Sequence, residues 1–356
     1  MQPFVYNALP ARVIFGHGTI SQVSTEIHNL GCSKALILTS PGQIKAGQTL
    51  QASLGPELAV GLFSKAILHT PVDVTEEAVQ LAQTLAADCV VALGGGSTIG
   101  LGKAIALRTD LPQIVIPTTY AGSEATAVLG QTQDGIKTTQ KSMKVLPEVI
   151  IYDVDLTLGL SLRTTITSGI NAIAHAVEAL YAAEANPITD LLAEQGIERL
   201  ARALPILSKD PQNKDARSDA LYGAWACSVC AGTVGFALHH KLCHAIGGTF
   251  NLSHADTHTV LLPHTVAYNA PFTNPAMVKV VRNLGIPEGV SAARGIYDLA
   301  KNNGAPYALK DIGMKEEDLE RAVDVALKNP YPNPAPLERE KMLALLRDAY
   351  EGRRPA

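Results

Sequence analysis

The sequence is poor in aromatic residues and has no excess of basic charge. Phe, Trp and Tyr make up 5% of its 356 residues, whereas hydrophobic residues make up 47%. An interior of Ala, Leu, Val and Ile is typical of helix-rich or α/β proteins. The formal net charge of −4 leaves no basic field for a nucleic-acid backbone. Since no apolar run reaches the roughly 20 residues that span a bilayer, we expect neither nucleic acid nor a membrane as a partner.

Cysteine is also scarce. The five cysteines are an odd number spread along a long chain, which argues against a disulfide framework. No apolar signal-peptide segment follows the polar start "MQPFVYNALP", so we expect a reducing, cytoplasmic location. Cys227 and Cys230 form a C-x-x-C spacing, but no proline separates them and the surrounding stretch "AWACSVCAGTVGFAL" is apolar. This pattern favours helix packing over a redox site.

The chain is long enough to bury two hydrophobic cores. From Lys34 onward, short apolar runs such as "KALILTS" and "CVVALGGGS" alternate with amphipathic segments such as "TEEAVQLAQTLAA". This alternation predicts a doubly wound parallel sheet, whereas helical patterns take over after Leu160. We predict an α/β dinucleotide-binding domain over residues 1–160 and an all-α domain over residues 161–356. The cleft between two such domains is where a ligand is expected.

A glycine-rich turn lies between an apolar run and a helical segment in "VVALGGGSTIGLGKAIAL". It contains Gly94, Gly95, Gly96 and Ser97. Glycines let the backbone approach a phosphate closely, and the free N–H groups at a helix N-terminus attract an anion. The spacing matches neither a Walker A loop nor the usual dinucleotide fingerprint. The turn therefore indicates either a phosphate site or a tight strand-to-helix connection without a ligand.

A second polar loop, "IPTTYAGSEAT", also follows an apolar run. It offers Thr118, Thr119, Ser123 and Glu124. In open parallel sheets, ligands bind at the carboxyl ends of the strands. Hydroxyl and N–H groups from two adjacent loops suit a pyrophosphate. The alternative is that the Thr and Ser side chains cap the next element.

Half of the ten histidines lie within residues 239–258, "HHKLCHAIGGTFNLSHADTH". His240 and His244 are four residues apart, so they share one face of a helix and suit either metal binding or acid–base chemistry. The zincin pattern fails because a lysine stands where the catalytic Glu is required. We expect this helix to end at residues 247–248, with His254 beyond it. The density of imidazoles favours a site over isolated core histidines.

Another helical stretch, "TSGINAIAHAVEALYA", places Asn171, His175 and Glu178 on one face. If the two helices meet, Asn171, His175, His240 and His254 can surround one point. A cation held by three neutral imidazoles calls for a carboxylate as the remaining ligand. Asn171 supplies a neutral amide instead, so we do not expect a tightly held Fe or Zn.

Together, these motifs resemble the iron-containing alcohol dehydrogenase superfamily over essentially the whole chain. The matching features are the "GGGS" turn, the "PTT...SE" loop, the helix "GINAIAHAVE" and an H-x-x-x-H-x-x-G...H segment. The resemblance implies an N-terminal α/β domain that binds a nicotinamide cofactor and a C-terminal helical domain. It also implies a homodimer with a small-molecule substrate.

Three departures are similar to the maleylacetate reductase branch. Asn171 stands where metal-dependent members carry Asp, Gly100 replaces a second Asp, and "TTYAGSEAT" replaces the common "TTAGTGSE". The resemblance implies reduction of the carbon–carbon double bond of maleylacetate, a dicarboxylate, to 3-oxoadipate in aromatic catabolism, without a metal. In such an enone the charge spreads into an enolate, which hydrogen-bond donors can stabilise in place of a Lewis acid.

The resemblance also implies roles for individual residues. His240 and His244 are the candidate donors to the enolate and proton sources, beside His175 and His254, with Asn171 as a hydrogen-bonding residue. Lys141 matches a lysine near the nicotinamide, although a solvated surface lysine is the alternative. The predicted cofactor-binding residues are Ser40, Gly94, Gly95, Gly96, Ser97, Thr118, Thr119, Ser123 and Lys141.

Charge bears on two further predictions, the choice of cofactor and the residues that bind the substrate carboxylates. Ser40 stands where NAD-preferring relatives tend to carry an Asp that binds the ribose hydroxyls, so NADPH is expected beside NADH. A dicarboxylate substrate requires cationic partners. By motif position, the nearest candidates are Lys141, Lys241 and Arg163, and the sequence does not choose among them.

Other functions remain as alternatives. A metal-dependent alcohol or polyol dehydrogenase of the same superfamily would hold stoichiometric Fe or Zn and oxidise simple alcohols. A non-catalytic nucleotide-binding protein is a second alternative, against which the histidine cluster argues. A lyase similar to dehydroquinate synthase would need metal ligands that the chain lacks in part.

Overall fold

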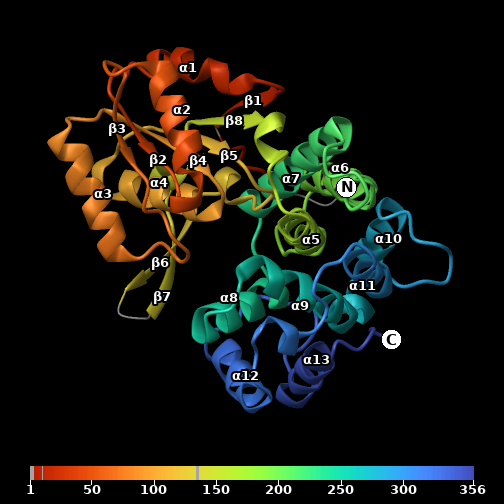
Figure 1. The fold of residues 1–356 in the computed structure, drawn as a ribbon. Helices are drawn as coiled ribbons and strands as arrows, with labels where there is room; N and C mark the ends of the chain where they lie inside the picture. Colours follow the sequence, from red (N-terminus) through yellow and green to blue (C-terminus); the bar gives the residue numbers. More distant parts are fainter. Residues whose placement is uncertain (1–3, 10, 134–135) are drawn as a thin grey trace. The chain divides into compact units, whose positions relative to one another are not determined.

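The computed structural model describes residues 4–9, 11–133 and 136–356. The chain divides into two compact units (Figure 1). The α/β unit is Ala8–Gly159, and the helical unit is Leu160–Ala356 together with the residues up to Asn7.

The α/β unit contains a six-stranded sheet in the order β1-β8-β5-β4-β2-β3, and every pair of neighbouring strands is parallel. The strands are β1 (Arg12–Gly16), β2 (Ala35–Leu38), β3 (Ala59–Phe63), β4 (Cys89–Gly94), β5 (Gln113–Pro117) and β8 (Val149–Asp153). The sheet confirms the predicted doubly wound fold. The chain runs outward from β2 to β3 and returns to the other side of β2 as β4, which makes β2 and β4 the switch point where such sheets bind ligands.

Alternating side chains of the buried strands face two helical layers. Ala35 and Ile37 share a core with α1 (Val23–Asn29) and α2 (Ile44–Leu54). On the opposite face, a Cβ at Gly102 of α4 (Gly96–Thr109) would lie 3.3 Å from the Ala92 Cβ, so this helix packs closely on β4. Helix α3 (Val72–Thr84) packs beside α4. The continuous apolar runs in the sequence are thus strands covered on both faces.

A two-stranded antiparallel sheet follows β5. It consists of β6 (Val128–Gln133) and β7 (Ile136–Lys141), with Val128 opposite Lys141. The sequence pattern did not predict this hairpin, because its strands are rich in Gln, Thr and Lys rather than in alternating apolar residues. Lys141 lies at the exposed end of β7.

The helical unit contains nine α-helices among the described residues and confirms the predicted all-helical class. They are α5 (Leu162–Ala179), α6 (Pro187–Leu207), α7 (Lys214–Thr233), α8 (Leu238–Phe250), α9 (His254–Asn269), α10 (Asn274–Asn283), α11 (Ala292–Asn302), α12 (Leu319–Lys328) and α13 (Arg339–Glu351). The prediction that the histidine-bearing helix ends at residues 247–248 is wrong. α8 continues to Phe250 and ends where Asn251 adopts the left-handed conformation, with φ of 53°, because helical glycines are tolerated where tertiary packing holds the helix.

Helices α6 and α7 approach each other closely. A Cβ at Gly196 of α6 would lie 3.0 Å from the Gly223 carbonyl of α7. Cys227 and Cys230 are buried free thiols on α7, and the Cys230 Sγ lies 3.3 Å from the Thr189 carbonyl oxygen. Within the described part of the chain, no single helix is long and apolar enough to cross a membrane; only α7 and α8 taken together, with a 97° bend between them, reach that length and composition.

Candidate active site

Five histidine side chains from three helices of the helical unit lie close together. α5 contributes His175, α8 contributes His240 and His244, and α9 contributes His254 and His258. The ring centroids of His175 and His240 are 5.0 Å apart, and those of His244 and His254 are 6.1 Å apart. The His258 ring lies 4.9 Å from His240 and 4.3 Å from His254, so it links the two pairs. The structure brings together the four histidines that the sequence singled out and adds His258.

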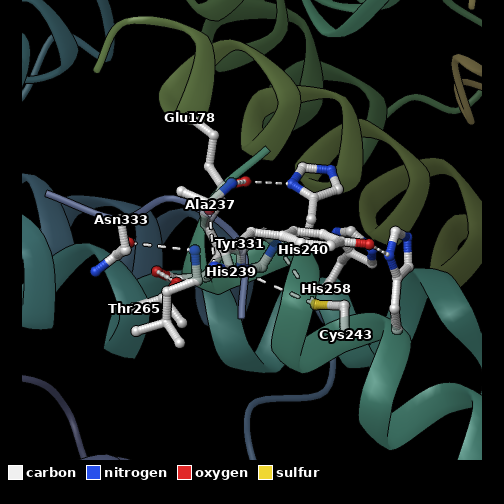
Figure 2. Close-up of polar contacts among 12 residues, drawn as sticks. Glu178, Ala237, His239, His240, Cys243, His258, Thr265, Tyr331 and Asn333 are labelled. Atoms are coloured by element: carbon white, nitrogen blue, oxygen red, sulfur yellow. Dashed lines mark hydrogen bonds and ion pairs between the residues drawn. The ribbon is translucent and has the colours of Figure 1, made fainter. Parts of the chain in front are cut away.

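The His240 ring is held on both faces and at one edge. Phe236 stacks on one side at 4.0 Å between centroids and 18° between planes, and His175 stacks at 5.0 Å and 19°. At the edge, Nδ1 lies 2.6 Å from Glu178 Oε2, within a buried pair. Figure 2 shows Glu178 and His240 joined in this way. The opposite edge, Nε2, has no hydrogen-bond partner among the described residues.

Glu178 also accepts hydrogen bonds from the start of α8. Its Oε2 accepts from the Ala237 N–H at 2.9 Å and its Oε1 from the His239 N–H at 2.8 Å. Burial raises the pKa of Glu178 to about 7, and the backbone N–H groups oppose that rise. One carboxylate therefore binds both the N-terminus of α8 and the imidazole of His240.

A chain of hydrogen bonds runs behind this pair from α9 to α8. The Thr265 hydroxyl donates to the Leu261 and Leu262 carbonyls at 3.1 and 3.0 Å, so its oxygen can only accept from His239 Nδ1, 3.1 Å away. His239 Nε2 then carries the lone pair and accepts from His258 Nδ1 at 3.0 Å (Figure 2). His258 is left with an unprotonated Nε2 that has no partner among the described residues.

Burial keeps these imidazoles neutral at neutral pH. It lowers the pKa of His175 from 6.5 to about 4 and the pKa of His239 from 6.5 to about 3. Burial also lowers the pKa of His240 and of His258 well below 6.5, and the neighbouring histidines add to the effect. The tautomers set by hydrogen bonds, rather than charge, decide which nitrogen can donate.

We expect Thr265→Val to lower the free energy of unfolding by about 1–3 kcal/mol, because it leaves the buried Nδ1 of His239 without an acceptor. The measurement is urea unfolding at pH 7.5. Thr257→Val is the matched control, since Thr257 is equally buried on α9 and its hydroxyl, among the described residues, donates only to the Ser253 carbonyl, at 2.7 Å. Equal losses in the two variants would contradict a role for the histidine chain.

The polar groups nearer the surface have partners of their own. His244 Nδ1 lies 3.2 Å from the Tyr331 hydroxyl, and the Lys241 Nζ lies 5.4 Å from the centre of the Tyr331 ring. Arg163 forms a bidentate pair with Asp256, at 2.8 and 3.4 Å. Of the three cations proposed for a carboxylate substrate, Arg163 is therefore already engaged.

The glycine turn lies at the carboxyl end of β4. Gly94 ends β4, Gly95 is the N-cap of α4 and Gly96 is its first residue. A Cβ at Gly94 would overlap the Thr98 hydroxyl and lie 2.7 Å from Gln43 Oε1, whereas the nearest atom to a Cβ at Gly96 is 3.7 Å away. Gly94 is thus required by packing, whereas a Cβ at Gly96 would make only an ordinary van der Waals contact, with the Ala121 Cβ.

Polar side chains from the adjacent loops surround this turn. Ser40 follows β2, and Gln43 donates to the Thr118 hydroxyl at 2.8 Å, which joins the loops after β2 and β5. The hydroxyls of Thr98, Thr119 and Ser123 are buried without a hydrogen-bond partner among the described residues. Buried hydroxyls without partners are costly unless a ligand satisfies them.

Family models match both parts of the chain. The model described as iron-containing alcohol dehydrogenase matches residues 10–154, and the C-terminal model of the Fe-containing alcohol dehydrogenase family matches residues 165–350. The protein belongs to the iron-containing alcohol dehydrogenase family. It is therefore an oxidoreductase, and the resemblance inferred from the motifs is confirmed.

Relatives within the iron-containing alcohol dehydrogenase family are similar over the full chain. The maleylacetate reductase of Rhizobium sp. (strain MTP-10005) is 52% identical over 355 residues, which cover 100% of both chains. The crystal structure of maleylacetate reductase from Agrobacterium tumefaciens is 50% identical with a TM-score of 0.95, and that of a putative alcohol dehydrogenase from Ralstonia eutropha JMP134 is 52% identical with a TM-score of 0.98; each covers 100% of both chains. Within the family, the sequence groups with the maleylacetate reductases.

The family name implies iron, and the residues present do not fit it well. Asn171, buried in α5 one turn before His175, offers an amide where a hard carboxylate is preferred. Among the described residues of the helical unit, the three potential ligand atoms that lie within 4.8 Å of one another belong to His239, Cys243 and His258. Two of these, His239 Nε2 and His258 Nδ1, are already bonded to each other at 3.0 Å.

Several residues of this oxidoreductase could not be singled out from the sequence. Gln43 lies in an ordinary polar stretch, Phe236 and Tyr331 are isolated aromatics, and His258 lies within the histidine-rich stretch without a motif to mark it. The sequence pattern marks Glu178 only as a residue that shares a helix face with His175. A signal was available for Glu178 alone, because a carboxylate on a buried helix face requires a partner.

Proposed function

We propose that the protein is an NAD(P)H-dependent reductase that reduces the carbon–carbon double bond of 2-maleylacetate to a single bond, giving 3-oxoadipate, without a metal. The observation that carries this proposal is the 52% identity to a maleylacetate reductase over the full length of both chains. Asn171 in place of the family's Asp supports the metal-free part, because it removes the carboxylate from the ligand set.

The proposed nicotinamide cofactor fits the α/β unit at the switch point of its sheet. Its phosphates would lie against Gly94, Gly95, Gly96 and Ser97, where the N-terminus of α4 supplies N–H donors. The hydroxyls of Thr98, Thr119 and Ser123, which lack partners among the described residues, would donate to the same phosphates. When bound, the reduced nicotinamide supplies the hydride. Ser40 carries no charge that would repel a 2′-phosphate, which supports the use of NADPH beside NADH.

The histidine cluster would stabilise the charge that hydride transfer creates. Hydride addition to the conjugated carbon of an enone produces an enolate, which requires a hydrogen-bond donor and then a proton. We assign His240 and His244 as donors, His175 and His254 as their neighbours and Asn171 as a hydrogen-bonding residue. His240 is neutral at neutral pH and donates its Nδ1–H to the Glu178 carboxylate, so its Nε2 must take up a proton before it can donate to the enolate. The Glu178 carboxylate stabilises the imidazolium that this step forms. His244 is paired with the Tyr331 hydroxyl, and that pair offers a second route for the proton.

The two carboxylates of the proposed substrate need cations that are not already neutralised. Arg163 is paired with Asp256. Lys241 lies over the Tyr331 ring and, among the described residues, forms no ion pair, and Lys141 is exposed at the end of β7. We therefore propose Lys241 and Lys141, in preference to Arg163, as substrate or cofactor cations.

The test is an assay of chelator-treated protein whose residual Fe and Zn are measured. We expect NADH oxidation with maleylacetate to remain at full rate in metal-free protein, and none with lactaldehyde, the simple-carbonyl control. Activity that disappears with the metal, or that appears only with the aldehyde, would overturn the proposal in favour of a metal-dependent alcohol dehydrogenase. Absence of turnover with either compound would favour a non-catalytic nucleotide-binding protein.

A further inference from the structure

We propose that Glu178 is the positioning residue of His240: it holds the imidazole as the Nδ1–H tautomer and directs Nε2 toward the substrate. The assignment rests on the proposed function for its catalytic consequence, but its structural part stands on the contacts of Glu178 alone. In this role the buried Glu178 carboxylate does not itself touch the reacting atoms and acts through His240.

The hydrogen-bond partners of the Glu178 carboxylate determine which nitrogen of His240 carries the proton. Within the described part of the chain, the Glu178 carboxylate forms hydrogen bonds with His240 Nδ1 and with the backbone N–H groups of Ala237 and His239, and the backbone groups can only donate. A carboxylate that receives these two bonds favours its ionised, acceptor-only form. The third contact, from His240 Nδ1 at 2.6 Å, must then carry the proton on the imidazole. The lone pair of neutral His240 therefore lies at Nε2.

Glu178 also caps the N-terminus of α8. Ala237 occupies the N-cap position and has no side-chain oxygen to accept from the first N–H groups. Glu178 of α5 takes over the Ala237 and His239 N–H groups, and the Asn333 amide oxygen accepts from the Leu238 N–H at 3.2 Å (Figure 2). A carboxylate at a helix N-terminus is favoured by the helix dipole. The side chain that caps α8 is thus the one that orients His240.

The contacts of the His240 ring fix its orientation. With Phe236 and His175 stacked on its faces and Glu178 at its Nδ1 edge, the imidazole cannot rotate without breaking a contact. Only the Nε2 edge is without a partner among the described residues. With its plane fixed and its lone pair at Nε2, the imidazole can take up a proton at Nε2 and pass it to a substrate atom, while the Glu178 carboxylate balances the charge of the imidazolium between the two steps.

The direct test is nitrogen NMR of protein labelled with 15N-histidine, with the His240 signals identified by their absence in His240→Gln. We expect wild-type His240 at about pH 8.5, where Glu178 with its pKa of about 7 is ionised, to show a protonated Nδ1 and an unprotonated Nε2. A proton on Nε2 and none on Nδ1 would overturn the proposal. This measurement requires neither substrate nor turnover.

The kinetic test compares Glu178→Gln with Asn333→Ala. The amide keeps the size of the side chain but has one acceptor oxygen, so it cannot accept from all three donors. We expect Glu178→Gln to lower kcat with maleylacetate about 100-fold, with KM and the affinity for NADH changed less than about threefold. Asn333→Ala removes a cap from the same helix start without touching His240, and we expect its kcat to stay within about threefold of wild type.

Equal losses of kcat in the two variants would show that Glu178 acts only as a helix cap, and would overturn the proposal. If wild-type protein reduced no maleylacetate at all, the proposed function would fail, while the tautomer measurement would still confirm or overturn the positioning role. The two failures are therefore distinguishable.

Discussion

Below about pH 6.5 the protein is expected to lose stability steeply, because its buried histidines stay neutral in the fold and become charged in the unfolded chain. Burial lowers the pKa of His175 and of His264 from 6.5 to about 4, and that of His239 from 6.5 to about 3. As the pH falls through 6.5, the unfolded chain takes up protons that the folded protein does not. Stability is therefore complete above pH 6.5 and lost toward pH 4.

The expected size of this loss is large. Each such histidine contributes up to about 1.4 kcal/mol per pH unit, so the three together can remove about 6 kcal/mol between pH 6.5 and pH 5. Glu178, whose pKa is raised to about 7 in the fold, takes up a proton over the same range and offsets about 2 kcal/mol of this loss. The net loss is still a large share of the total stability of a typical domain, about 5–15 kcal/mol. Acid unfolding near pH 5 is therefore expected from the burial of His175 in the five-histidine cluster, of His239 behind it and of His264 outside it.

The measurement is the free energy of urea unfolding at half-unit intervals from pH 7.5 to pH 5. His264→Gln should reduce the slope by about one proton whatever its effect on absolute stability, since His264 lies apart from the five-histidine cluster. His28→Gln is the control, because His28 is exposed on α1 and lies outside the buried set. A free energy that stays constant from pH 7.5 to pH 5 would contradict the prediction.

Substitutions in the glycine turn are expected to separate packing from cofactor binding. In Gly94→Ala the new methyl group would overlap the Thr98 hydroxyl and lie 2.7 Å from Gln43 Oε1. We expect a loss of about 1–3 kcal/mol of stability and about 100-fold in NADH affinity, because the turn must shift. In Gly96→Ala the nearest atom is 3.7 Å away, so stability should be unchanged.

Gly96→Ala nevertheless places a methyl group where the proposed phosphate approaches the first residue of α4. We expect at least a 10-fold loss of NADH affinity, about 1.4 kcal/mol, with an unchanged melting temperature. Fluorescence titration and thermal unfolding measure the two quantities. Gly159→Ala is the control, since no atom lies within 4 Å of its added Cβ. Wild-type affinity in Gly96→Ala would place the phosphates elsewhere.

Local sequence patterns are sufficient to predict the fold class and the motifs that carry the chemistry. Short apolar runs alternating with amphipathic segments encode a parallel sheet within windows of about ten residues, and the spacing of His240 and His244 puts both on one helix face wherever that helix lies. The presence of Asn171, where metal-dependent relatives carry Asp, can also be recognised from the sequence without coordinates. These features are local, so nothing distant is needed to interpret them. The hairpin β6–β7 could not be predicted in this way, because its strands carry no alternation of apolar and polar residues.

Which atoms these residues present to a ligand depends on contacts between distant parts of the chain. Glu178 and His240 are 62 positions apart, and Thr265 and His239 are 26 apart. Whether His240 donates or accepts at Nε2 depends on a carboxylate that another helix brings to its opposite edge. Likewise, the buried state that keeps the histidines neutral depends on how α5, α8 and α9 pack. Hydrogen-bond partners and burial are long-range properties of the packed chain, and the short windows that encode helices and strands do not contain them.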